Sequence, residues 1–163
     1  MDAAFLTIES TALSTWLRDS PSLWAFPFVL ILHTIGLALL VGTGLAVAVR
    51  ALGLARDVPL AALAPYLRVL WLGFWLNAGS GVLLLIAYPT KALTNPLFYA
   101  KLALIAAALA ALWPLLGRIR RGIEGDVGTA LKAAALVSLA CWAASITAGR
   151  FLAYTYTRLT VFF

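Results

Sequence analysis

The sequence has little of what catalytic and metal-binding proteins use. Its 163 residues include one histidine, one cysteine, one methionine and only six acidic residues. The single cysteine, Cys141, excludes a disulfide within the chain, and one histidine with one cysteine cannot form a closed metal site. No serine–histidine–aspartate set, CxxC pair, CxxCH motif, P-loop or dinucleotide fingerprint occurs. An independent enzyme is therefore not expected, and at most the chain is a redox subunit.

Charge is also scarce, whereas apolar residues are abundant. Charged residues make up 11% of the chain and hydrophobic residues 64%, while soluble domains contain about 25% charged residues. This composition predicts an integral membrane protein in contact with lipid. The net charge of +6 does not predict a nucleic-acid partner, because the basic residues lie at the ends of apolar runs, where they set membrane orientation.

Four apolar runs are long enough for a helix that crosses a bilayer, which takes about 20 residues. They cover approximately residues 23–49, 66–88, 98–116 and 131–152. Each backbone amide in hydrocarbon must be satisfied within its own segment, so the runs predict helices. Pro59 and Pro65 bracket a connection expected to hold one helical turn, and Pro114 and Gly117 are expected to close the third helix. The fold prediction is all-α: residues 1–163 form one transmembrane domain, a four-helix bundle.

A shorter amphipathic segment precedes the first run. Over residues 5–19 the apolar side chains of Phe5, Ile8, Ala12 and Trp16 share one helical face. We expect one short helix here, lying in the outer membrane interface.

The distribution of lysine and arginine predicts the orientation. Seven of the 12 basic residues lie in or beside the first and third loops: Arg50, Arg56, Arg68, Arg118, Arg120, Arg121 and Lys132. The other five lie on the opposite side: Arg18, Lys91, Lys101, Arg150 and Arg158. Because cytoplasmic loops carry the basic excess, both termini are predicted on the outer side.

Small residues form stripes at i, i+4, i+8 spacing, where a neighbouring helix can approach closely. The first helix carries Ala38, Gly42 and Ala46, and the second carries Gly73, Asn77 and Gly81. We interpret both stripes as helix-packing surfaces.

His33 is the most informative residue, because no other ionisable side chain occurs between Leu23 and Val49. Such a residue inside a membrane usually faces a partner, a cofactor or water. At ~1.5 Å per residue, His33 and Asn77 lie roughly 14 and 16 Å from the outer interface. Lys101 and Arg150 also fall in the outer half. Each helix therefore contributes one strongly polar group to the same half of the membrane.

These residue types suit a redox cofactor. Imidazole ligates haem iron or copper and can donate to a quinone carbonyl, and the two cations suit haem propionates or lipid phosphates. The predicted site has His33 as metal ligand, with Asn77, Lys101, Arg150 and Tyr154 as cofactor contacts. Tyr99 and Tyr156 could add hydroxyls near its mouth. In the alternative interpretation, His33 and Asn77 only join helices, and the two cations extend to lipid headgroups.

Three strings resemble a family of small uncharacterised bacterial inner-membrane proteins with four helices. They are His33–Gly42 followed by Arg50–Gly53, Asn95–Lys101 at the entry to the third helix, and Ala148–Tyr154 in the last helix. The resemblance covers nearly the whole chain, and it places His33, Lys101 and Arg150 inside the family motifs. It implies a bacterial inner membrane, so the outer side on which both termini are predicted would be the periplasm. The first helix also distantly resembles the copper-resistance CopD-type membrane proteins.

Three functions remain open at this point. The first is a membrane subunit that holds a haem b or a quinone near His33 in an electron-transfer complex. The second is a non-catalytic structural or assembly subunit, which binds partner helices or lipid through its small-residue stripes. The third is an anion carrier or channel with Lys101 and Arg150 at its outer opening. A haem with two histidine ligands would need a second subunit, either another copy of this chain or another membrane protein.

Overall fold

The computed structural model describes residues 2–159, and the side chains of residues 5–152, 154 and 155. Within these residues there are no strands. The four long helices are α3 (Phe26–Leu52), α4 (Tyr66–Ala87), α6 (Pro96–Arg120) and α7 (Thr129–Leu159). Each of them overlaps a segment that is long and apolar enough to cross a membrane. The predicted all-α architecture with four transmembrane helices is therefore confirmed.

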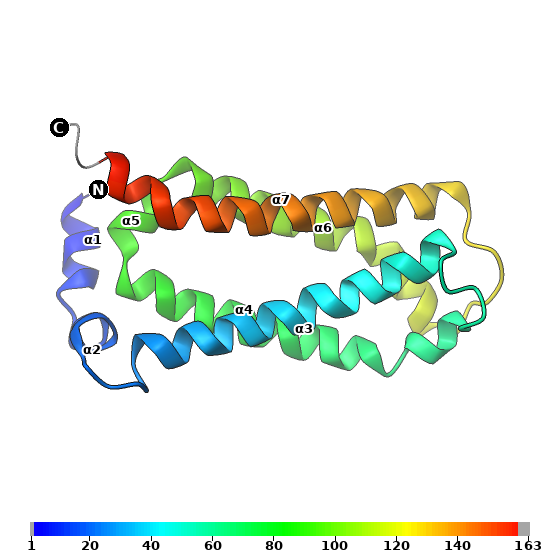
Figure 1. Ribbon diagram of the computed structural model, residues 1–163, viewed down its shortest axis with the longest axis horizontal. Helices are drawn as coiled ribbons and strands as arrows, with labels where there is room; N and C mark the ends of the chain where they lie inside the picture. Colours follow the sequence, from blue (N-terminus) through cyan, green and yellow to red (C-terminus); the bar gives the residue numbers. More distant parts are fainter. Residues whose placement is uncertain (1, 160–163) are drawn as a thin grey trace.

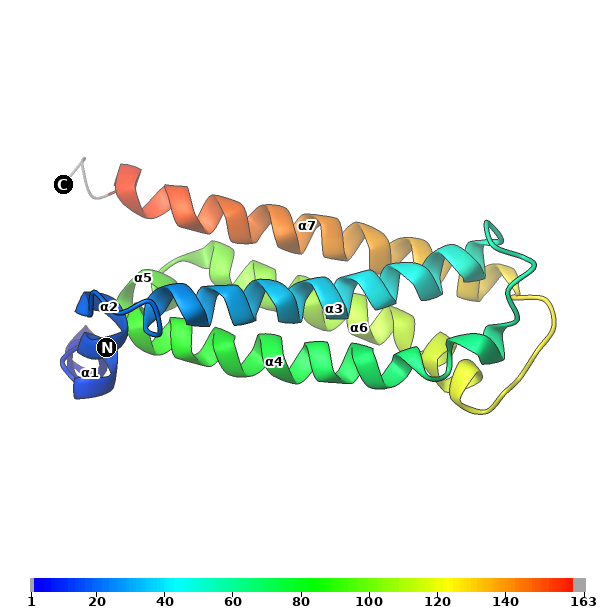
Figure 2. The ribbon, with the colours of Figure 1, turned by 60° about the horizontal axis from the view of Figure 1, so that its bottom comes forward.

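The helices form two antiparallel pairs, α3 with α4 and α6 with α7 (Figure 1). We call one end of the bundle the terminal end; it holds α1 (Asp2–Glu9), α2 (Ala12–Asp19) and α5 (Pro89–Leu93). The opposite end, the loop end, carries the α3–α4 and α6–α7 connections. The first connection contains the predicted helical turn, η1 (Leu60–Leu63). In both ribbon views α3 and α7 come together toward the loop end and separate toward the terminal end (Figure 1, Figure 2).

Glycines bring the backbones of α3 and α4 into contact. A Cβ atom on Gly73 would lie 2.6 Å from the backbone N of Leu40, and one on Gly36 would lie 2.5 Å from the backbone N of Asn77. The predicted stripe on the second membrane helix therefore does face a neighbour. The predicted stripe on the first helix does not lie in this contact, because Ala38, Gly42 and Ala46 are all exposed. Small residues occur on two faces of α3, and the spacing rule cannot tell which face meets α4.

The main apolar core lies toward the loop end. Leu40 and Val47 of α3, Leu70 of α4, and Leu112 and Ile119 of α6 belong to one buried cluster. Large branched side chains from several helices fill this half of the bundle. A smaller cluster, formed by Leu17, Val29 and Ala87, lies at the terminal end. The two ends of the bundle are thus held together differently.

Helix α6 is longer than predicted. It does not close at Pro114 and Gly117 but continues to Arg120. Pro114 is exposed, and transmembrane helices tolerate such prolines. At the other end, the Asn95 side chain accepts a hydrogen bond from the backbone N of Leu97 at 2.9 Å and caps the helix.

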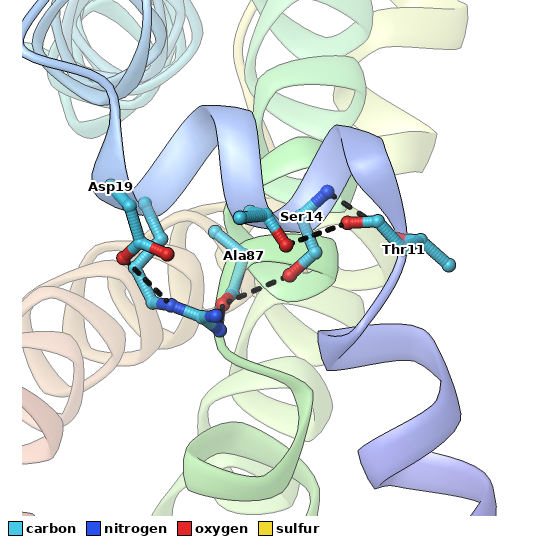
Figure 3. A network of polar contacts seen from close by, with 6 residues as sticks. Thr11, Ser14, Asp19 and Ala87 are labelled. Atoms are coloured by element: carbon cyan, nitrogen blue, oxygen red, sulfur yellow. Dashed lines mark hydrogen bonds and ion pairs between the residues drawn. The ribbon is translucent and has the colours of Figure 1, made fainter.

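The segment 5–19 is two short helices rather than one. Thr11 separates them, because its hydroxyl caps α2 by accepting from the backbone N of Ser14 at 3.3 Å. Helix α2 then lies across the end of α4 (Figure 3). The Ser14 hydroxyl and the Arg18 guanidinium both donate to the carbonyl of Ala87, each at 3.5 Å. These bonds occupy a carbonyl in the last turn of α4 that has no partner within the helix.

Candidate functional site

His33 lies between α3 and α4, and its Nδ1 atom meets two groups of α4. The Nδ1 atom is 3.1 Å from the backbone carbonyl oxygen of Asn77 and 3.1 Å from the hydroxyl oxygen of Ser80. Gly81 leaves room for the ring, since a Cβ atom there would lie 3.3 Å from the Cε1 atom of His33. One edge of the imidazole is therefore fixed against the neighbouring helix.

The surrounding groups select the tautomer. The Asn77 carbonyl can only accept, and the Ser80 hydroxyl donates to the backbone carbonyl of Leu76 at 2.6 Å. Two acceptors at 3.1 Å outweigh the one competing donor, the Asn77 amide at 3.4 Å. The proton of a neutral ring therefore belongs on Nδ1, which leaves the lone pair on Nε2. Nε2 has no hydrogen-bond partner among the described residues.

Asn77 holds the two helices at this level. Its side-chain amide donates to the backbone carbonyl of His33 at 2.9 Å. The same residue thus accepts from the imidazole through its backbone and binds the α3 backbone through its side chain. This double contact fixes both the position and the orientation of His33.

Lys101 of α6 lies on the other side of the bundle, along α7. Its Nζ atom would be 3.5 Å from a Cβ atom on Gly149, so the absence of a side chain there makes room for the lysine. Lys101 is also near enough to His33 for charges on the two side chains to interact. Among the described residues it forms no hydrogen bond or ion pair. It therefore has no counter-ion inside the described part of the chain.

Arg150 and Tyr154 form a separate pair. Both side chains are exposed on α7, and the Arg150 guanidinium lies over the Tyr154 ring, 5.2 Å from its centroid. Arg150 forms no hydrogen bond or ion pair with His33 among the described residues. Tyr99 is exposed and donates to the carbonyl of Leu93 at 2.9 Å, while the side chains of Tyr156 and Arg158 lie outside the described residues. The predicted site residues thus fall into three groups: His33 with Asn77, Lys101 near His33, and Arg150 with Tyr154.

Two contributors were not among the predicted site residues. Ser80 completes the acceptor pair for the imidazole, and Gly36 lets the Asn77 backbone approach α3. The signal for Ser80 is its position three residues after Asn77, which places both on one helical face. Nothing in the sequence distinguishes Gly36 from the other glycines of α3, since only the pairing of α3 with α4 assigns it this role.

No group of three or more histidine, cysteine or acidic side chains that could hold a metal ion occurs among the described residues. His33 could thus supply one ligand to a metal, not a complete set. No known protein family, curated protein or solved structure matches this chain. The resemblance drawn from the helix strings therefore remains a prediction.

Proposed function

We propose that the chain is a subunit of a bacterial inner-membrane electron-transfer complex, in which His33 ligates a haem b through Nε2. The observation that carries the proposal is that the two nitrogens of the imidazole differ in their hydrogen bonds. Nδ1 donates to a backbone carbonyl of α4, while Nε2 keeps a lone pair without a partner. Metal-ligating histidines are held in this way, with the second ring nitrogen bonded to a carbonyl or carboxylate.

Lys101 supports a haem more than a neutral ligand. A haem carries two propionates, and an ammonium without a counter-ion near the iron ligand is suited to pair with one of them. Arg150, on the exposed face of α7, would take the second only if the haem extends beyond the monomer. A haem bound at His33 would supply a one-electron couple, and the surrounding apolar helices would keep water away from it.

Quinone is the weaker fit of the two cofactors. The ring proton is on Nδ1 and is hydrogen-bonded to the Asn77 carbonyl. Nε2 can therefore accept a hydrogen bond but cannot donate one to a quinone carbonyl. Lys101 would have to be the donor instead. The hydrogen bonds of His33 therefore favour iron ligation over contact with an oxidised quinone.

The proposal extends to the partner subunit and to the topology. Since the chain has one histidine, a second histidine ligand would come from another copy of the chain or from another membrane subunit. The basic residues around the loop end favour a cytoplasmic location for that end. Both termini would then face the periplasm, and His33 would lie in the periplasmic half of the membrane.

A second candidate is a structural or assembly subunit without a cofactor. The specific observation in its favour is that His33 forms hydrogen bonds with Asn77 and Ser80 across the α3–α4 contact. Polar bonds of this kind join transmembrane helices in the absence of any ligand.

Absorption spectra of two His33 variants separate the candidates. We would purify the full chain in mild detergent from cells supplied with haem precursor, and record oxidised and dithionite-reduced spectra. A Soret band and a reduced α-band, lost in both His33→Ala and His33→Gln, are expected for iron ligation. Gln can still donate to the Asn77 carbonyl but does not replace imidazole as a haem ligand.

The thermal unfolding of the same proteins provides the control. For a residue that only joins helices, His33→Gln should keep most of the stability that His33→Ala loses. A colourless wild-type preparation in which the Gln variant is as stable as wild type would contradict haem binding and favour the structural subunit.

A further inference from the structure

We infer that the loop end carries a binding site for a phosphate-bearing anion, supplied by a lipid headgroup or by free phosphate. A cavity of about 520 Å³ lies between the end of α3 and the α6–α7 connection. Its charged lining residues are Arg50, Arg56, Lys132, Glu124 and Asp126. The site is independent of His33, which lies in the other half of the bundle.

The two arginines are held by carbonyls and not by carboxylates. Arg50 donates from Nε to the carbonyl of Val58, and Arg56 donates from Nε to the carbonyl of Gly53 at 3.2 Å. The terminal Nη groups of both have no acceptor among the described residues. Each guanidinium is therefore oriented by one bond and retains donors for a further ligand.

The carboxylates in the cavity do not neutralise these arginines. Glu124 accepts from the backbone N of Leu60 at 3.3 Å and from that of Ala61 at 2.7 Å, so both of its oxygens are held toward η1. Asp126 pairs with Lys132 at 3.4 Å and is 89% exposed. No ion pair joins either arginine to a described acidic residue. The cavity thus contains two guanidinium groups that form no ion pair with a described carboxylate.

The position of the cavity points to phosphate. The segment Phe26–Leu52 and the segment that starts at Thr129 are both membrane spans. Arg50 and Lys132 lie within one turn of their ends, at the level where headgroup phosphates lie. Arginine pairs bind phosphate oxygens through paired N–H donors, and basic pockets between helices recognise anionic headgroups.

Native mass spectrometry in mild detergent tests the site on the full chain. The probes are phosphatidylglycerol, phosphatidylcholine of the same acyl length, and inorganic phosphate as competitor. We expect wild type to retain phosphatidylglycerol more tightly than phosphatidylcholine. Arg56→Gln and Lys132→Gln should each weaken the affinity by about tenfold, the cost of losing a charge-assisted hydrogen bond.

Two further variants make the result specific. Arg68→Gln removes an equal charge from an exposed residue at the same end that does not line the cavity, and it should change affinity less than about twofold. Asp126→Asn should strengthen binding, because it removes the carboxylate that competes for Lys132. A merely structural role for these residues would not produce gains and losses of opposite sign.

The competitor identifies the source of the phosphate. Displacement of the lipid by millimolar inorganic phosphate would show that the anion alone occupies the site, whereas retention would show that acyl chains contribute. Affinities for both phosphatidylglycerol and phosphate that are equal in wild type, Arg56→Gln and Lys132→Gln would overturn the proposal.

Discussion

The two halves of the bundle are stabilised by different kinds of contact. Toward the loop end, side chains such as Leu40, Leu70 and Leu112 form one buried apolar cluster across several helices. At the level of His33, the α3–α4 contact instead contains hydrogen bonds through Asn77 and Ser80. An apolar half can be packed without any ligand, whereas a polar group in hydrocarbon must have a partner. The comparison indicates that apolar packing holds the loop half together, whereas interhelical hydrogen bonds join α3 to α4 at the level of His33.

The largest effect is expected where the two halves meet, at Gly73. Gly73→Leu would force side-chain atoms into the backbone of α3, since even a Cβ atom would lie 2.6 Å from the backbone N of Leu40. We expect the free energy of unfolding to fall by more than about 3 kcal/mol, or the α3–α4 pair to separate. Unfolding in detergent by denaturant titration measures this loss.

Gly42→Leu is the matched control for that substitution. A Cβ atom on Gly42 meets nothing within 4 Å, so its stability should change by less than about 0.5 kcal/mol. Equal losses in the two variants would contradict the assignment of α4 to the Gly36 face of α3.

The second effect tests the apolar half. Leu112 is 1% exposed in the main cluster, whereas Leu102 on the same helix is 46% exposed. Leu112→Ala should lower the free energy of unfolding by about 2 kcal/mol, because it leaves a cavity between packed helices. Leu102→Ala should cost much less, because lipid can fill the space. The same titration measures both variants. Similar losses would mean that Leu112 is no more tightly packed than the exposed Leu102.

The third effect tests the polar half. Asn77→Ala removes the side-chain bond to the His33 carbonyl but keeps the backbone carbonyl that accepts from Nδ1. We expect a loss of about 0.6 kcal/mol, which is typical of a hydrogen bond between membrane helices. Under the haem proposal the reduced α-band should persist, in contrast to His33→Gln. Loss of the band in Asn77→Ala would show that the side chain, and not the backbone, orients the imidazole.

Much of the architecture could be predicted from the sequence, because hydrophobic length alone specifies transmembrane helices. The contact between His33 and Asn77 also follows from their similar depth in the membrane and from the cost of an unpaired polar group there. The facing of the helices could not be predicted. Small residues occupy two faces of α3, and depth alone placed Arg150 with His33 although its side chain is exposed on α7. The depth of a residue in the membrane follows from its position along one helix. The direction in which its side chain points depends on which helices pack together.

The smallest effect on the free energy of global unfolding is expected at the loop end itself, outside the packed core. Glu124→Gln would replace a carboxylate that accepts from the backbone N of Leu60 and of Ala61 by a neutral amide. Charged acceptors form stronger hydrogen bonds than neutral ones, so η1 should open more often while the core beneath it stays folded. Amide exchange at Ala61 should accelerate by about tenfold, with little change at Leu115 in the core. Equal acceleration at both amides would mean that Glu124 supports the whole loop half, and packing would then not be the main force that holds it.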